Sequence, residues 1–339
     1  MRSEVPGTFH CWSRCVRRAW LMGKDEKFGR DYGHRRDWIL ERLELLASCF
    51  AIDVAFFATL SNHMHLVLRS MPRLVKQMGN QEVARRWLRV YPGKRVLDGQ
   101  WIEPTQAQVE ALAQDKVKLK KIRKRLSSIS WFMGALSEYV ARRANLEDGV
   151  TGCFWESRFK CREVADESGL LVCGIYVDLN QMRAGEACTP EDSFYSSISH
   201  RLFAESSEAG DPSCGRVADW LAPLTVADDQ LGEVPSSSGR RASDKGLLSM
   251  PLADYTRLLL WTAGQVERDE PEPMPEELAG CAAALGVVPE EFATAVRDFP
   301  ASFSRVVGRR EHMVERANGA GRRWFRGIRR AAEIFINQT

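Results

Sequence analysis

The chain has 339 residues, of which 44% are hydrophobic and 27% charged, and its formal net charge is +3. This composition is typical of a packed protein with one large domain or two ordinary ones, and it excludes global disorder. No uninterrupted apolar run reaches the length of about 18 residues that a membrane span needs. The first residues, MRSEVPGTFHCWSR, lack the apolar core of a signal peptide, so we expect a cytoplasmic protein.

The nine cysteines are irregularly spaced and form no CxxC motif. This pattern does not indicate a disulfide framework or a structural zinc site. In a cytoplasmic protein such residues are small buried hydrophobes, and we expect that role here.

Charge is unevenly distributed along the chain. Residues 116–125, KVKLKKIRKR, contain seven basic side chains and no acidic one, and residues 309–330 are also strongly basic. Blocks of this kind favour a polyanionic partner such as nucleic acid, although each could equally be a solvated helix face.

The first 70 residues predict a strand, a helix and two further strands in order. Residues 8–16 are strand-like, 35–50 have apolar residues at helical spacing, and 51–60 and 63–69 are rich in β-branched, aromatic and alternating residues. A Ser61-Asn62 break between the last two predicts an antiparallel hairpin packed under a helix. This order is half of a ferredoxin-like α+β unit.

The missing half is predicted later in the chain. Residues 128–145 indicate an amphipathic helix, 157–164 a strand and 168–185 a second helix. Residues 71–130 are polar, basic and mostly helical, which indicates an insertion. The expected fold is therefore α+β, an antiparallel ferredoxin-like sheet with helices on one face.

Beyond residue 200 the composition changes. Residues 201–245 contain two stretches rich in Ser, Gly, Pro and Asp, ESSEAGDPSCG and PSSSGRRASDKG, which predict a linker. Residues 246–339 predict a mainly helical, basic C-terminal region. We thus expect one folded unit over residues 1–200 with the 71–130 insertion, followed by the linker and this region.

His63 and His65 are the most distinctive local pattern. Alternate side chains of a strand point to one face, so the two imidazoles are expected side by side. Two imidazole nitrogens on one face can ligate a divalent metal ion that polarises a phosphate oxygen. The same pattern also fits two half-exposed histidines on a polar sheet surface.

Tyr139 is the candidate nucleophile by residue type. It lies in the middle of the predicted 128–145 helix, with Arg143 one turn later on the same side. An adjacent arginine favours the phenolate and can hold a phosphate. On its own, Tyr139 could equally be a packing residue of an amphipathic helix.

Five motifs occur in one order along the chain: TFHCWSRCVRRAWLMG, SNHMHLVLR, WFMGALSEYVARRAN, GCFWESRFKCREV and YVDLNQMRAGEACTPEDSFYSSI. Together they resemble the single-tyrosine HUH transposases, in particular the REP-associated tyrosine transposase branch, over residues 8 to 200. Gln181 stands where that family usually has proline.

The resemblance implies a metal-dependent enzyme that cleaves and rejoins single-stranded DNA. His63 and His65 would ligate a divalent metal, Mg or Mn. Tyr139 would attack the scissile phosphate and give a 5′-phosphotyrosine link and a free 3′-OH. Because this link conserves the phosphodiester energy, rejoining needs no nucleotide cofactor.

In relatives a polar residue one turn after the tyrosine completes the metal site, but here that residue is Arg143, which cannot ligate a cation. Asn145 and His10 are the alternatives for a metal ligand or a supporting residue.

The family's partner is hairpin-forming single-stranded repeat DNA, which requires phosphate contacts and base stacking. Trp155 could stack on a base or lie in the core, and the basic tail around Trp324 and Arg326 could clamp hairpin DNA. The basic residues expected to contact DNA are Arg14, Arg17, Arg18, Lys118, Lys120, Lys121, Arg123, Arg143, Arg158 and Lys160.

Two other functions stay open at this point. One is a nucleic-acid-binding protein on the same fold that has lost its catalytic activity, and the other is an RNA-binding protein. We expect a monomer or homodimer and no membrane partner.

Overall fold

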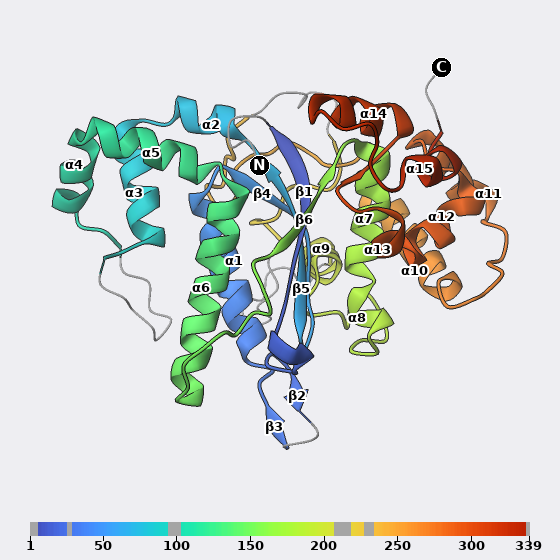
Figure 1. The fold of residues 1–339 in the computed structure, drawn as a ribbon, viewed down its shortest axis with the longest axis horizontal. Helices are drawn as coiled ribbons and strands as arrows, with labels where there is room; N and C mark the ends of the chain where they lie inside the picture. Colours follow the sequence, from blue (N-terminus) through green and yellow to red (C-terminus); the bar gives the residue numbers. More distant parts are fainter. Residues whose placement is uncertain (1–5, 26–28, 94–102, 207–217, 227–233, 337–339) are drawn as a thin grey trace.

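The computed structural model describes residues 6–25, 29–93, 103–206, 218–226 and 234–336 (Figure 1). The strands are β1 Gly7–Arg14, β2 Lys24–Asp25, β3 Arg30–Asp31, β4 Ile52–Thr59, β5 His63–Ser70, β6 Lys160–Val164 and β7 Val306–Val307. The helices are η1 Val16–Arg18, α1 Arg35–Cys49, α2 Pro72–Gln77, α3 Asn80–Val90, α4 Gln106–Gln114, α5 Lys116–Leu126, α6 Ile129–Asp148, α7 Glu167–Asp178, α8 Asn180–Arg183, α9 Ser197–Glu205, α10 Leu252–Gln265, α11 Glu276–Ala284, α12 Pro289–Arg297, α13 Phe299–Ser302, α14 Arg310–Gly319 and α15 Ile328–Ile334.

The fold is α+β, built on a five-stranded sheet in the order β4-β5-β1-β6-β7. Every neighbouring pair is antiparallel except β6 and β7, which are parallel. The predicted β4–β5 hairpin is confirmed, and its turn closes with a hydrogen bond from Leu60 N to the His63 carbonyl at 2.8 Å. Helix α1 connects β1 to β4, and α6 lies between β5 and β6 in the chain.

The two faces of the sheet differ in chemistry because side chains alternate along each strand. One face, which we call the histidine face, carries His10, Trp12, His63, His65 and Arg162, as the register of β1 with β5 and β6 requires. The opposite face carries apolar side chains of the same strands, including Cys11, Met64, Leu66 and Leu68.

Helices cover both faces of the sheet, whereas we had expected them on one face only. Helices α1 and α6 pack on the opposite face in one hydrophobic core, and α7 with the C-terminal helices packs on the histidine-face side in a second core (Figure 1). The reason is that the histidine face is polar only in part. Phe56, Val67 and Val164 lie on the same side and need apolar cover.

Helix α7 approaches the sheet closely. Asp166 caps its N-terminus by accepting a hydrogen bond from Gly169 N at 2.8 Å. A Cβ at Gly174 would lie 2.7 Å from the Phe56 ring, so only glycine permits this separation. This close packing brings the side chains of α7 onto the histidine face.

A buried arginine joins α1 to the end of α6. Arg35, whose side chain is fully buried, donates hydrogen bonds to Glu147 at 2.7 Å and to Asp148 at 2.5 Å. Such charge-assisted bonds hold the two helices in one arrangement on the opposite face.

The predicted insertion and linker both contain ordered structure. Helices α2 to α5 occupy the insertion, in which residues 94–102 lie outside the described residues. In the predicted linker, residues 207–217 and 227–233 lie outside the described residues. Its described parts pack against the sheet: Trp220 is fully buried, and Asp53 on β4 accepts hydrogen bonds from Ser243. Among the described residues, no helix is both long and apolar enough to cross a membrane.

Candidate active site

The histidine pair lies as the alternation predicts. His63 and His65 share one face of β5, with their ring centroids 5.1 Å apart. Across β1 they face Arg14 and Trp12, respectively. His65 is 5% exposed and His63 is half-buried, so the pair is not a solvated polar surface.

Hydrogen bonds engage the Nδ1 atom of each histidine. Asn62 Oδ1 lies 2.7 Å from His63 Nδ1, and because a carbonyl oxygen can only accept, His63 Nδ1 carries the proton. His65 Nδ1 lies 2.9 Å from His10 Nε2. When His65 donates in this bond, Nε2 of both His63 and His65 keeps a lone pair for a metal ion.

All three histidines are neutral at neutral pH. Burial lowers the pKa of His63 to about 4, and the charge of Arg14 adds to the effect. Burial also lowers the pKa of His65 and His10 well below the usual range, with Arg162 contributing at both. Neutral imidazole is the form that ligates metals, so the site needs no deprotonation before binding one.

The donor set fits a metal ion with open coordination positions. Nε2 of His63 and Nε2 of His65 are available as ligands. Among the described residues, no third His, Cys, Asp or Glu side chain joins others in a group that could hold a metal ion. A metal bound here would therefore keep positions for water or a phosphate oxygen. His10 is buried beside His65 and hydrogen-bonded to it through Nε2, while its Nδ1 has no hydrogen-bond partner among the described residues.

Tyr139, the nucleophile expected from the sequence, does not lie beside the histidine pair. It is on α6 and packs in the core on the opposite face, with Met64 and Leu66. Its hydroxyl accepts a hydrogen bond from Arg143 Nη1 at 2.9 Å, and the Arg42 guanidinium lies 5.0 Å from its ring centroid. The sheet separates Tyr139 from the histidine pair.

Tyr176 is the tyrosine that reaches the histidines. Its ring centroid lies 5.6 Å from that of His65, in an edge-on contact, and 6.0 Å from that of His10. It extends from α7, within the YVDLNQMRAG motif that contributed to the resemblance without being assigned chemistry. The signal missed in the sequence was a tyrosine within the strongly apolar helical segment 168–185, four residues before Asn180.

The environment of Tyr176 is enclosed and positive. The ring is 7% exposed, and burial raises the pKa of its hydroxyl, which the charges of Arg183 and Arg162 oppose. The Arg183 guanidinium lies 5.8 Å from the ring centroid. Two arginines near a phenol favour the phenolate and an approaching phosphate.

The C-terminal region contributes directly to this enclosure. Phe299 of α13 is fully buried, with its ring centroid 4.9 Å from that of Tyr176 and 5.7 Å from that of His10. Arg162 donates to the Phe299 carbonyl at 3.0 Å, and its guanidinium lies over the Phe299 ring. The region predicted as a separate helical part therefore forms one wall of the site.

Five of the predicted DNA contacts lie on segments next to the histidines. Arg14 faces His63, and Asn62 donates to the carbonyl of Arg18, so η1 adjoins the start of β5. The backbone of Glu156 bonds to the carbonyl of Arg14 at 2.8 Å, which places the segment leading into β6 there as well. The exposed members of this group are Arg17, Arg18, Arg158 and Lys160.

The other predicted contacts lie elsewhere or are engaged in the fold. Lys118, Lys120 and Lys121 are exposed on α5, within the insertion. Arg123 donates to the carbonyls of Val75 and Met78, so its role is structural.

Two further candidates are on α6, across the sheet from the histidines. Arg143 stacks on Trp38 and bonds to Tyr139, and Asn145 donates to the Gly152 carbonyl at 3.0 Å. Asn145 therefore cannot complete the metal site. Trp155 donates to the Ser137 carbonyl and packs in the core, so the structural alternative holds for it.

Comparisons with known proteins give one similar structure. No family model matches the chain, and no curated protein matches it. Among solved structures, the chain is similar to a REP-associated tyrosine transposase bound to a REP hairpin. The two share 12% sequence identity and a TM-score of 0.32, over 59% of this chain and 80% of that one.

Proposed function

We propose that the protein cleaves and rejoins single-stranded hairpin DNA, with Tyr176 as nucleophile and His63 and His65 as ligands of a divalent metal ion, Mg or Mn. We further propose that β1, α1, β4, β5, α6 and β6 form a ferredoxin-like unit. The order of these elements along the chain and the strand order β4-β5-β1-β6 support this assignment.

The observation that carries the proposed function is the ring contact of Tyr176 with His65. His65 Nδ1 is hydrogen-bonded to His10, so Nε2 is its remaining nitrogen for a metal ion. A nucleophile must lie close to the group that activates its target. Among the tyrosines in the described part of the chain, Tyr176 is the one with a ring contact to the histidine pair. A metal held by His63 and His65 would polarise a phosphate oxygen.

The proposed step exchanges one phosphate ester for another. The Tyr176 oxygen attacks the phosphorus, a P–O bond to Tyr176 forms and the P–O3′ bond breaks. The phenol loses its proton and the departing 3′ oxygen gains one, so the step is proton-neutral overall. Burial raises the pKa of Tyr176, and the positive charges of Arg183 and Arg162 oppose this rise and favour the phenolate that the attack requires. Rejoining is the reverse of this step with a 3′-OH as nucleophile.

The burial of Tyr176 supports a second candidate, a nucleic-acid-binding protein that does not cleave. Tyr176 is 7% exposed and its ring packs against that of Phe299, which leaves DNA little access to this residue. Binding through the exposed arginines of η1 and the β6 segment needs no such access.

One experiment separates the two candidates. The protein is incubated with labelled single-stranded hairpin DNA and Mn²⁺ or Mg²⁺, and covalent protein–DNA adducts are resolved on a denaturing gel. We expect an adduct that disappears in Tyr176→Phe, which keeps the buried ring, and persists in the matched control Tyr139→Phe. Hairpin affinity should stay within a few-fold in both variants, because phosphate contacts dominate it.

Two results would count against the proposed reaction. An adduct lost in Tyr139→Phe and kept in Tyr176→Phe would place the nucleophile on the other face of the sheet. Tight hairpin binding with no adduct under either metal would favour the binding-only candidate.

A further inference from the structure

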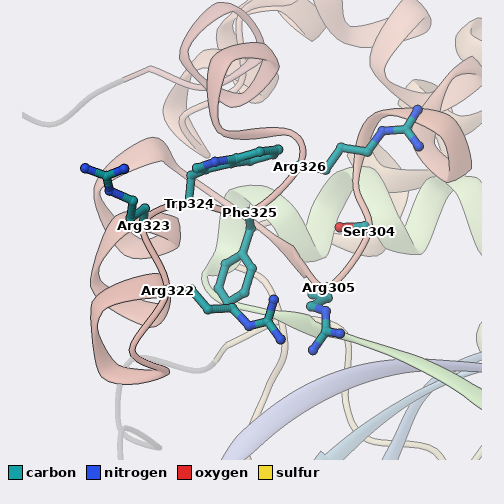
Figure 2. Close-up of a pocket in the computed structure, with 7 residues that line it drawn as sticks. All are labelled: Ser304, Arg305, Arg322, Arg323, Trp324, Phe325 and Arg326. Atoms are coloured by element: carbon teal, nitrogen blue, oxygen red, sulfur yellow. The ribbon is translucent and has the colours of Figure 1, made fainter.

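A basic hollow lies in the C-terminal region, outside the candidate active site. Its volume is 440 Å³, and it is lined by Ser304, Arg305, Arg322, Arg323, Trp324, Phe325 and Arg326 (Figure 2). The hollow lies between the segment leading into β7 and the segment that connects α14 to α15. These segments are distant in sequence and are brought together by the fold.

The charge of this hollow is unbalanced. Four of its lining residues are arginines, and no carboxylate is among the described residues that line it. Neighbouring arginines behave differently: Arg316 pairs with Glu163 at 2.6 Å and Arg330 pairs with Glu291 at 2.7 Å. Positive charge that meets no counter-charge among the described residues of a hollow favours the binding of an anion.

The backbone that presents these arginines is well fixed. Phe325 is 7% exposed and belongs to the core, and Arg322 N donates to the Ala317 carbonyl at 2.9 Å. On the other side, the Arg305 carbonyl accepts a hydrogen bond from Glu163 N at 2.8 Å, which ties the hollow to β6. The arginines therefore extend from an ordered frame.

Trp324 adds an aromatic surface to the positive charge. It is 67% exposed although it directly precedes the buried Phe325. In Figure 2 Arg305 and Arg322 turn toward the Phe325 ring, whereas Arg323 and Arg326 extend away from it on either side of Trp324. An exposed indole next to guanidinium groups that form no ion pair within the described parts of the chain matches a base next to its backbone phosphates. Base stacking on such a ring contributes about 1–3 kcal/mol.

We propose that this hollow is a second binding site for single-stranded DNA, in which the arginines hold backbone phosphates and Trp324 stacks on an unpaired base. The inference rests on the proposed function, because it assigns to the hollow the strand that flanks the cleaved phosphate. Three strand spacings separate β5, which carries the histidine pair, from β7, which follows Arg305; this is a lateral distance of roughly 15 Å.

Binding is tested in the Tyr176→Phe background with EDTA present, so that neither cleavage nor metal is required. Fluorescence anisotropy measures the affinity of a labelled single-stranded thymidine oligonucleotide at several salt concentrations. The variants are Trp324→Ala, Trp324→Phe and the double variant Arg322→Gln with Arg323→Gln. The matched control is Arg257→Gln with Arg268→Gln, which removes the same charge from exposed arginines that are paired with glutamates.

We expect Trp324→Ala to weaken binding about 5-fold or more, and Trp324→Phe to recover part of the loss because a ring remains. The Arg322/Arg323 double variant should weaken binding and reduce the slope of log affinity against log salt by about 1.4, or about 0.7 for each phosphate that is no longer neutralised. The Arg257/Arg268 control should change neither quantity to this extent. Thermal unfolding should be unchanged in all variants, because the altered side chains are exposed.

Three results would overturn the inference. The first is wild-type affinity for the oligonucleotide in the Trp324 and Arg322/Arg323 variants. The second is a loss of affinity in the Arg257/Arg268 control equal to that in the Arg322/Arg323 variant. The third is binding of a duplex, which has no unpaired base, that is as tight as binding of the single strand and equally dependent on Trp324. Weakened binding in the hollow variants without any adduct in the wild type would refute the cleavage reaction alone. An adduct in the wild type with unchanged binding in the hollow variants would refute this site alone.

Discussion

His10 offers the sharpest test of the metal site, because its proposed role depends on a single hydrogen bond. It is 2% exposed, and its Nε2 lies 2.9 Å from His65 Nδ1. His10→Leu removes the acceptor, whereas His10→Gln keeps an amide oxygen that can accept from His65. Comparing the two variants separates the hydrogen bond from the packing of the ring.

The expected magnitude follows from this geometry. His10→Leu leaves His65 Nδ1 buried without a partner, which should lower the free energy of unfolding by about 1–3 kcal/mol. Loss of the orienting bond should weaken Mn²⁺ binding about 10- to 100-fold, the usual effect of removing a residue that supports a metal ligand. His10→Gln should lose less affinity than His10→Leu, because His65 keeps a partner for its donor.

The assay is a titration with Mn²⁺, in which electron paramagnetic resonance reports the free ion, together with urea unfolding of each variant. His34→Gln serves as control, because His34 is exposed and pairs with Glu147, away from the histidine face. If His10→Leu binds Mn²⁺ as tightly as the wild type while its unfolding free energy falls, then His10 is a packing residue. Equal loss of Mn²⁺ affinity in His10→Leu and His34→Gln would also refute the reasoning.

The remaining predictions concern stability. Burial raises the pKa of Asp178 to about 6 from 3.8. The free energy of unfolding should therefore fall by up to about 3 kcal/mol as pH rises from about 4 to above 6. Urea unfolding at several pH values should show a much weaker pH dependence of this free energy in Asp178→Asn, and an unchanged pH dependence would contradict the assignment. Gly174→Ala places a Cβ 2.7 Å from the Phe56 ring and should cost about 1–3 kcal/mol, whereas Gly264→Ala, which meets open space, should not destabilise; equal thermal midpoints of the two variants would argue against the close approach of α7. Arg35→Met should lower the unfolding free energy by less than the ~3–5 kcal/mol typical of breaking a fully buried ion pair, because the Glu147 and Asp148 side chains are partly exposed to solvent. A urea midpoint equal to that of the wild type would show that these ion pairs contribute nothing to stability.

Much of the local structure was predictable because its causes are local. The period of two in residues 63–69 placed His63 and His65 on one face, and β5 confirms it. Helical spacing located α1 within a residue of its observed end. The Ser61-Asn62 break predicted the hairpin, since two apolar strands separated by a short polar turn pair with each other.

The choice of tyrosine shows where local reasoning ends. Periodicity indicates which residues of a helix share a face, but it does not by itself indicate which side of the sheet the helix covers. Helix α6 covers the apolar face of β5, and α7 covers the histidine face, so Tyr176 rather than Tyr139 lies beside His65. The deciding factor is the burial of apolar area on both faces of one sheet, which involves residues far apart in the chain.

The sequence by itself therefore determined strands β1, β4, β5 and β6, the shared face of the two histidines and the positions of the basic blocks, because each depends on neighbours along the chain. The tertiary structure alone decided the partners: Tyr176 and Phe299 around the histidines, His10 behind His65, and Arg305 beside Arg322 in the basic hollow. These contacts join segments up to hundreds of residues apart, and packing of the two cores on either face of the sheet sets them.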